Sequence, residues 1–248
     1  MSVFGLAIVD DSKDLAMNVV RQIAKKLLTV CLPREKFLVR GPRSSGRKPC
    51  LALTFDDGPH PEHTARLLDR LDDLGLKGTF FVIGRHAAEY PELIRRMAAT
   101  GHEVANHTYT HSDPGQTSAS RFLDEIRRTD ELLSEITGRA ASTVRPPKGE
   151  LSWPKLRGLW NRRQAVALWN VDPKDFRMKS SEEIVQWCHA YTPRDGDIVL
   201  MHDNHPYAIR AVEALAANGV FERFQTTTIS RWLKRSTEST AKDFLPTN

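Results

Sequence analysis

The sequence lacks paired cysteines, a long apolar run and a recognisable secretion signal. Its three cysteines, Cys31, Cys50 and Cys188, are scattered and form no CxxC pair, so neither a disulfide framework nor a thiolate metal site is indicated. No apolar run approaches the ~20 residues that a transmembrane helix needs. The run Leu27–Leu32 is shorter than the ~7–15 apolar residues of a signal peptide, and no small-residue cleavage site follows it. These absences predict a cytoplasmic protein.

The excess of positive charge is confined to the first part of the chain. Residues 17–48 hold nine basic residues against one acidic residue, a net charge of +8, whereas residues 49–248 carry −1 of the total of +5. A nucleic-acid-binding domain needs a basic face, so we expect no nucleic-acid partner.

The basic segment also has an apolar stripe, from Val20 to Cys31, opposite Arg21, Lys25 and Lys26. One interpretation is an interfacial helix that gives the protein peripheral contact with an anionic membrane. The other is a helix packed across the main domain.

The composition, with 40% hydrophobic and 27% charged residues, is that of a globular protein with one main domain. The stretch GPRSSGRKP at 41–49 marks the predicted boundary. We therefore predict a basic, partly helical N-terminal arm over residues 1–48, a main domain over 49–235 and a C-terminal tail over 236–248.

Within the main domain, predicted strands alternate with predicted helices. Strands are expected at 51–55, 79–83, 103–106, 143–145, 165–169 and 197–201, with a last one before Trp232. Helices are expected at 61–74, 91–100, 118–137, around Trp153 and Trp160, at 180–191 with Ser180 and Glu183 as a capping box, at 206–217, and through Trp232. This order predicts an α/β fold, a distorted (β/α) barrel of about seven parallel strands with its active site at their carboxyl ends.

Two adjacent aspartates, Asp56 and Asp57, follow the first of these strands and are followed at once by Gly-Pro. Neighbouring carboxylates repel each other and resist burial unless a cation or a proton joins them. The third strand is followed by HTYTH, whose His107 and His111 have the spacing that places two imidazoles on one side of a helical turn. Two imidazoles and one carboxylate can hold a divalent metal with positions left open, as a hydrolytic site requires. One aspartate can then be a ligand, while the other stays free as a base.

Polar residues also follow the later strands. Arg145 opens RPPKG, Asp172 and Asp175 lie in WNVDPKDF, and His202 follows IVLM. An arginine can hold a catalytic carboxylate ionised, and an aspartate paired with a histidine raises the pKa of the histidine, which can then donate a proton. A metal, a base and an acid at separate strand ends indicate a hydrolase.

The motifs TFDDGP, HTYTH, RPPKG, DPKDF and LMH occur here in the order found in the polysaccharide deacetylases of carbohydrate esterase family four. Over roughly residues 50–233 the chain resembles this family, which includes chitin, chitooligosaccharide and peptidoglycan N-acetylglucosamine deacetylases. The resemblance implies a metal-dependent hydrolase that removes N-acetyl groups from N-acetylhexosamine units of a glycan.

The resemblance also implies a role for each motif residue. Asp56 is the implied general base, and Asp57, His107 and His111 are the implied ligands of one divalent metal. A ligand set of imidazole and carboxylate without thiolate favours zinc, with cobalt, nickel or manganese as alternatives, over calcium.

The other three motifs are implied to supply the remaining parts of the site. Arg145 orients the base, Asp175 tunes the acid, His202 is that acid, and Leu200 lies in the pocket wall. Two further pocket positions depart from the family pattern, because Lys148 stands where tyrosine is usual and Phe176 where tryptophan is usual.

Other interpretations compete with these roles. The aspartates could form a polar turn in which Asp57 caps the next helix. Arg145 and Asp175 could form only structural ion pairs, with each other or with neighbours. The histidines outside the motifs, His205 among them, are interpreted as structural. An alternative function is a deformylase or deacylase of a lipid-linked amino sugar at the membrane, which the basic arm would suit. A non-catalytic glycan-binding module would lack the base or the acid.

Overall fold

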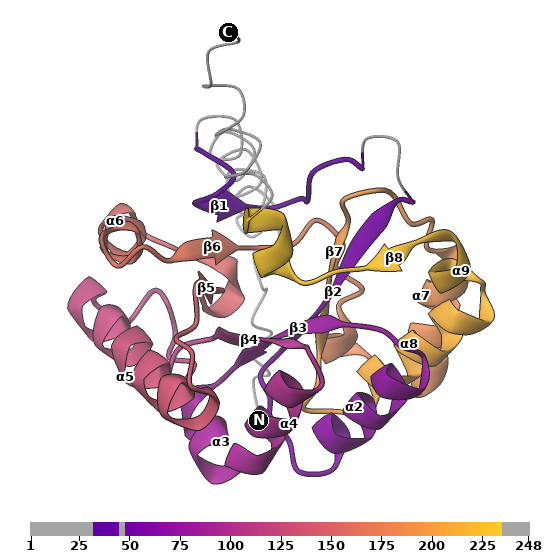
Figure 1. Ribbon diagram of the computed structural model, residues 1–248, viewed down its shortest axis with the longest axis horizontal. Coiled ribbons are helices and arrows are strands. Elements are labelled where there is room, and N and C mark those ends of the chain that lie inside the picture. Colours follow the sequence, from indigo (N-terminus) through magenta and orange to yellow (C-terminus); the bar gives the residue numbers. More distant parts are fainter. Residues whose placement is uncertain (1–31, 45–47, 235–248) are drawn as a thin grey trace, which may run out of the picture.

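The computed structural model describes residues 32–44 and 48–234, and one parallel sheet forms their centre (Figure 1). Its eight strands are β1 (Phe37–Leu38), β2 (Cys50–Asp56), β3 (Gly78–Val82), β4 (Glu103–Asn106), β5 (Thr143–Val144), β6 (Ala165–Ala167), β7 (Ile198–His202) and β8 (Gln225–Thr226). Neighbours follow the order β1-β6-β5-β4-β3-β2-β7, with β8 paired to β2, and every pair is parallel. The predicted α/β class and distorted barrel are confirmed, with β1 as a strand that the sequence did not indicate.

Helices surround the sheet (Figure 1). They are α2 (His63–Asp73), α3 (Gly84–Glu89), α4 (Pro91–Ala99), α5 (Ala119–Thr137), α6 (Trp153–Asn161), α7 (Ser181–Ala190), α8 (Tyr207–Ala217) and α9 (Val220–Arg223). Residues 229–234 are also helical, as predicted for the segment through Trp232. Two short 3₁₀ helices, η1 (Pro147–Gly149) and η2 (Asp175–Arg177), lie in the loops. The described residues include no helix long and apolar enough to cross a membrane.

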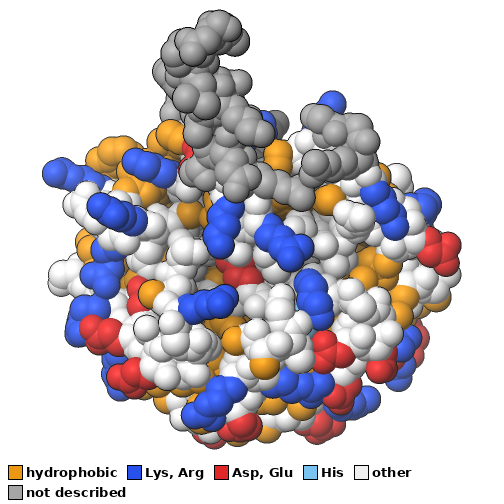
Figure 2. Space-filling view, viewed as in Figure 1, with side chains coloured by type: hydrophobic (Ala, Val, Ile, Leu, Met, Phe, Trp, Pro, Cys, Tyr) orange, Lys and Arg blue, Asp and Glu red, His pale blue; other side chains and the backbone are white. Residues whose placement is uncertain are grey.

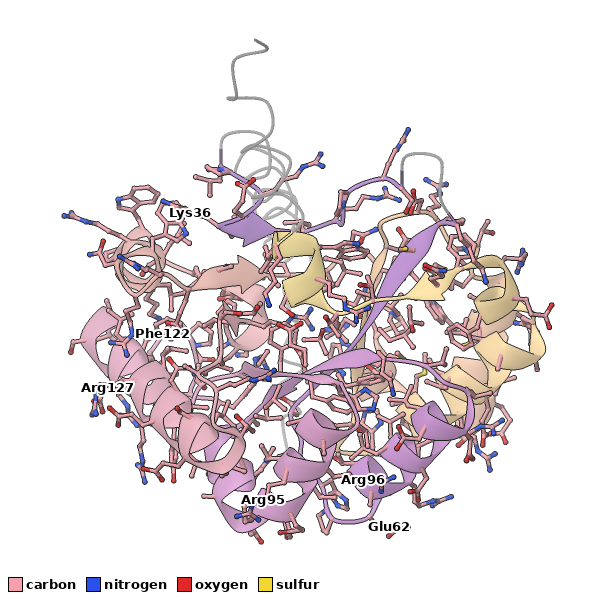
Figure 3. The ribbon with its side chains drawn as sticks, in the orientation of Figure 1. Lys36, Glu62, Arg95, Arg96, Phe122 and Arg127 are labelled. Atoms are coloured by element: carbon pink, nitrogen blue, oxygen red, sulfur yellow. The ribbon has the colours of Figure 1, made fainter. Side chains whose placement is uncertain are left out.

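The longest described helix, α5, shows why these segments are helical. Ser118 accepts a hydrogen bond from the backbone N–H of Arg121 at 3.2 Å, which caps the first turn. Gly138 ends the helix with a φ of 72°, a left-handed conformation that glycine adopts without strain. Phe122 is buried toward the sheet, whereas Arg127 lies on the outer side of the helix (Figure 3). Apolar residues on one face and charged residues on the other explain why α5 packs as it does.

The predicted capping box of α7 is wrong. Ser180 is the N-cap residue, but its side chain makes no capping hydrogen bond. Glu183 accepts instead from the backbone N–H of Lys179 at 3.3 Å. The position of the helix start was therefore predicted correctly, but not the contacts that stabilise it.

Residues 37–41, which the sequence assigned to the N-terminal arm, connect the two edges of the sheet, β6 and β7. β1 pairs with β6 at one end, and the N–H of Gly41 donates to the carbonyl of Gly196, just before β7, at 2.8 Å. Arg40 forms an ion pair with Asp197 at 2.9 Å in the same place. The predicted amphipathic helix within residues 1–31 and the tail from 235 lie outside the described residues, and the division of the chain at residue 48 stays a prediction.

Candidate active site

The two aspartates stand at the carboxyl end of β2, which is buried along its whole length. Asp56 is the last residue of the strand and is paired in register with Phe81 of β3 and His202 of β7. Asp57 follows with a φ of 74°, outside the strand conformation. This change of backbone direction separates two adjacent carboxylates, so each has different partners. The helix-cap interpretation of Asp57 is wrong, because Glu62 is the N-cap of α2.

His107 and His111 come together at the end of β4, but no helical turn joins them. Thr108 and His111 have φ values of 68° and 56°, and a loop connects the two rings, whose centroids are 4.9 Å apart. The loop is held by two hydrogen bonds, from the N–H of Thr108 to Asn106 and from the N–H of His111 to the Thr108 hydroxyl. The spacing correctly predicted proximity, but left-handed residues rather than helix geometry produce it.

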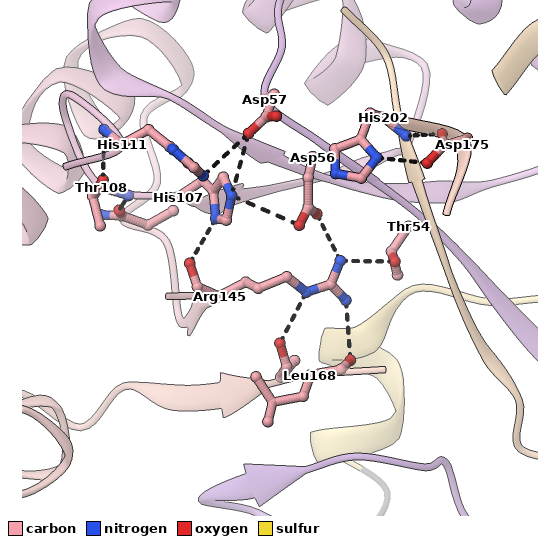
Figure 4. Close-up of polar contacts among 12 residues, drawn as sticks. Thr54, Asp56, Asp57, His107, Thr108, His111, Arg145, Leu168, Asp175 and His202 are labelled. Atoms are coloured by element: carbon pink, nitrogen blue, oxygen red, sulfur yellow. Dashed lines mark hydrogen bonds and ion pairs between the residues drawn. The ribbon is translucent and has the colours of Figure 1, made fainter. Parts of the chain in front are cut away.

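Asp57, His107 and His111 have ligand atoms that all lie within 4.8 Å of one another (Figure 4). Asp57 Oδ1 is 3.4 Å from His107 Nε2 and 3.5 Å from His111 Nε2. His107 Nδ1 donates to the carbonyl of Arg145 at 2.7 Å, which leaves Nε2 facing the carboxylate.

The charges and hydrogen bonds of these three residues fit a divalent cation. Asp57 Oδ1 is buried and, among the described residues, has no hydrogen-bond partner. Burial opposes ionisation of Asp57, but His107, His111 and His202 outweigh it and hold its pKa well below the usual range. Burial likewise opposes the charge on His107, yet Asp56 and Asp57 raise its pKa, so the site favours positive charge. Two imidazole nitrogens and one carboxylate oxygen suit a transition ion such as zinc.

Asp56 is bound by Arg145, the largest fully buried side chain described. Arg145 Nη1 donates to Asp56 Oδ1 at 2.6 Å and to Thr54 at 2.9 Å, while Nε and Nη2 donate to the carbonyls of Ala167 and Leu168, each at 3.0 Å. Every guanidinium nitrogen thus has a partner, which a buried cation requires. The other oxygen of Asp56 lies 3.7 Å from His107 Nε2, beside the metal-ligand cluster. The carboxylate is therefore fixed in direction and charge-balanced.

Asp175 and His202 form a second pair. His202 Nδ1 donates to Asp175 Oδ1 at 2.7 Å, and the backbone N–H of His202 donates to Oδ2 at 2.8 Å. Burial lowers the pKa of His202, but the hydrogen bond and charge of Asp175, with Asp56 and Asp57 further away, raise it to about 9. The imidazolium is therefore the dominant form at neutral pH. Arg145 and Asp175 do not pair with each other, because their ion-pair partners are Asp56 and His202 respectively.

Known proteins resemble the chain in sequence and in structure. The family model described as Polysaccharide deacetylase matches residues 43–159. A chitooligosaccharide deacetylase of Sinorhizobium fredii is 40% identical over 168 residues, which cover 66% of this chain and 77% of that protein. The chain belongs to the polysaccharide deacetylase family.

Two bacillus members of the polysaccharide deacetylase family are longer than the region they share with this chain. A peptidoglycan-N-acetylglucosamine deacetylase of Bacillus cereus is 35% identical over 54% of this chain and 49% of its own length. The peptidoglycan-N-acetylmuramic acid deacetylase PdaC of Bacillus subtilis is 31% identical over 86% of this chain and 44% of its own length. The structural match to the solved structure of PdaC covers 81% of this chain and 96% of the PdaC chain in that structure, with a TM-score of 0.71. This chain thus spans about half the length of these two relatives.

The three predicted pocket residues of this family member differ in exposure. Phe176 is 53% exposed, and its ring centroid is 5.5 Å from that of His202, so it lies beside the predicted acid. Leu200 is buried within β7. Lys148 is exposed, has a φ of 56° and donates from Nζ to Asp113 at 2.6 Å, in the loop after β4. The roles of all three in the pocket stay predictions.

One carboxylate beside this site, Asp203, was not predicted from the motifs, and one that was named with them, Asp172, lies apart. Asp203, next to His202, is buried, accepts from the Thr64 hydroxyl at 2.6 Å and has a pKa raised to about 7 by burial and by the charges of Asp57 and Asp56. Asp203 could have been found from the sequence because it directly follows His202, at the carboxyl end of β7. Asp172, by contrast, accepts from the backbone N–H of Lys174 at 2.8 Å and shapes its own loop.

Proposed function

We propose that the chain is a metal-dependent hydrolase that removes N-acetyl groups from N-acetylhexosamine units of a glycan. The observation that carries this proposal is the convergence of Asp56, the metal-ligand cluster and His202 at the carboxyl ends of β2, β4 and β7. The similar proteins are peptidoglycan and chitooligosaccharide deacetylases, which favours peptidoglycan or a chitooligosaccharide as the glycan. A binding module without catalysis is disfavoured, because the residues proposed as base and acid are both present.

Asp57, His107 and His111 would hold the divalent metal, for which we propose zinc. When bound, a divalent ion polarises the acetamide carbonyl and lowers the pKa of water. Asp56 takes the proton from the attacking water, and Arg145 keeps its carboxylate aimed at that position. The water oxygen bonds to the carbonyl carbon first, which places negative charge on the carbonyl oxygen. The carbon–nitrogen bond then breaks as the nitrogen is protonated.

His202 supplies the proton that the leaving amine requires. Its Nδ1 is occupied by Asp175, so Nε2 is the nitrogen that donates. Because its pKa is raised to about 9, the proton is present at neutral pH. Acetate and a free amino sugar are the products. We also propose that the backbone N–H at Lys148 stabilises the oxyanion, as the family resemblance implies.

Acetate and formate release from a panel of substrates tests the proposal. Metal-loaded protein is incubated with chitooligosaccharides, peptidoglycan fragments, and N-acetylated and N-formylated lipid-linked amino sugars. We expect acetate together with one free amine per event from the glycans. Formate release alone would favour the alternative deformylase, and no release from any substrate would refute both.

The pH dependence of turnover tests the role of Asp175. A general acid must be protonated, so the rate falls as pH rises through the pKa of His202, about 9. Burial lowers the pKa of His202, and the negative charge of Asp175 raises it. Asp175→Asn removes that charge, so the pKa of His202 falls and we expect the alkaline limb of kcat to move to lower pH. Asp172→Asn, a change of the same chemistry in the neighbouring loop, should leave the limb in place. An unchanged limb in Asp175→Asn would contradict the assignment of His202 as acid.

We further propose that an anionic membrane contacts the amino ends of the strands, which lie opposite the candidate site. Basic residues occur in the loops before several strands, among them Arg139 before β5, Arg163 before β6 and Arg194 before β7, and all three are exposed. In Figure 2, Lys and Arg side chains are spread over the visible face, on which no histidine is seen. Arg34 and Lys36, just before β1, are also exposed and would add to the attraction.

Flotation of the full chain with vesicles of anionic phospholipid tests this contact. Each basic residue contributes about 1 kcal/mol, and a change to glutamate also adds repulsion. Arg139→Glu, Arg163→Glu and Arg194→Glu together should therefore weaken binding at low salt by about 100-fold or more. The control reverses three arginines on outer helices, Arg66, Arg95 and Arg210. Equal binding by both triple variants, or no binding by the wild type, would refute a docking face at the strand ends.

A further inference from the structure

A second group of potential metal ligands lies beside the proposed acid. Asp175, at the start of η2, His202, at the end of β7, and His205, three residues further on, have ligand atoms within 4.8 Å of one another. Neither the sequence analysis nor the proposed mechanism gives His205 a role. The arrangement of hydrogen bonds around Asp175 shows what it can do.

Three of the four lone pairs of the Asp175 carboxylate are occupied. Oδ1 accepts from the N–H of Phe176 at 3.0 Å and from His202 Nδ1 at 2.7 Å, and Oδ2 accepts from the N–H of His202 at 2.8 Å. The carboxylate is fully buried, and the backbone N–H groups of Phe176 and His202 fix its orientation. One lone pair of Oδ2 remains, and His205 Nε2 lies 3.7 Å from that oxygen.

His205 Nε2 is itself buried and, among the described residues, has no hydrogen-bond partner. A separation of 3.7 Å is too long for a hydrogen bond to Asp175. It is close to the roughly 3.4 Å between two ligand atoms that are each about 2.0–2.2 Å from a tetrahedral zinc ion. A shift of a few tenths of an ångström would therefore let one ion join them.

We propose that Asp175, His202 and His205 form a second, inhibitory site for a divalent transition ion. The proposal rests on the proposed function for its consequence, but not for the binding itself. The ion would bind Asp175 Oδ2, His205 Nε2 and His202 Nδ1. His202 would release its Nδ1 proton to solvent, and the proton of neutral His205 would move from Nε2 to Nδ1, which gives up the hydrogen bond it accepts from the N–H of Tyr207 at 3.4 Å. A neutral, metal-bound imidazole cannot act as the imidazolium that protonates the leaving amine, so excess metal stops turnover.

The stoichiometry of zinc binding tests the site without any substrate. Full-length wild type, His205→Asn and a control, His189→Asn, which changes an exposed histidine on α7, are dialysed against increasing zinc. We expect two ions per chain at high zinc for the wild type and the control, and one for His205→Asn. The His107→Ala, His111→Ala double variant should keep the weaker ion and lose the tighter one. One ion per wild-type chain at every concentration, or two in His205→Asn, overturns the proposal.

Inhibition by zinc is the second measurement. Loss of one ligand should raise the half-inhibitory zinc concentration by about 10-fold or more in His205→Asn, while His189→Asn behaves as the wild type. Equal inhibition of His205→Asn and wild type overturns the inhibitory role. If no substrate is turned over at all, the proposed function fails, but the stoichiometry still decides whether the second site exists.

Discussion

Replacing both His107 and His111 with alanine is expected to abolish tight binding of the catalytic metal and to reduce acetate release by about 10³-fold or more. The metal supplies several kcal/mol of stabilisation to the developing charge, and the remaining ligand, Asp57, is a single carboxylate. Metal content by elemental analysis after dialysis, together with initial rates, measures both effects.

Folding must be separated from metal loss in this variant. The two rings lie at the end of β4 in a loop, outside the apolar core formed by β2, β3 and the helices, so circular dichroism should be unchanged. His189→Ala, on the exposed side of α7, is the control and should keep metal and activity. Undiminished metal content in a folded double variant would refute the assignment of the ligands.

The second large effect is expected for Asp56→Asn. Asparagine keeps an oxygen to accept from Arg145 Nη1 but cannot take a proton from water, so turnover should fall by about 10²–10⁴-fold. Metal content should not change, because Asp57, His107 and His111 remain. Kinetics and elemental analysis on the same preparation provide the measurement.

A matched control exists at the opposite end of the barrel. Asp197 is also a buried aspartate bound by an arginine, Arg40, at 2.9 Å, so Asp197→Asn tests the cost of disturbing such a pair away from the site. We expect lower stability but little change in turnover. If Asp56→Asn loses its metal while Asp57→Asn retains it, the two aspartates have been assigned the wrong way round. Near-normal activity of Asp56→Asn would refute its role as base.

The sequence predicted the fold and the grouping of the site because both depend on local patterns. Alternating apolar segments place the strands, and residues directly after parallel strands must meet at one edge of the sheet. Asp56 and His202 are register partners for this reason. The two-residue strand β1 was missed, because Phe37–Leu38 carries no pattern of its own and pairs with β6, far along the chain.

The parts of the site that were not predicted depend on backbone conformations and distant contacts. Non-glycine residues with positive φ, such as Thr108 and His111, are uncommon, and no sequence spacing indicates them. Asp203 and His205 gain their significance from burial beside other charged groups, which only the folded chain shows. Arg145 was expected near the base, but the two carbonyls that it also binds come from β6 and the residue after it.

The most direct test of a hydrolase with one catalytic metal is a titration of metal-depleted protein with zinc, in which bound metal and acetate release from a chitooligosaccharide are measured together. The account predicts no acetate without metal, and a rate that rises in proportion to bound zinc until one ion is bound per chain. Acetate release at full rate by the metal-depleted protein, or none from a folded chain with one zinc ion bound at Asp57, His107 and His111, would contradict it.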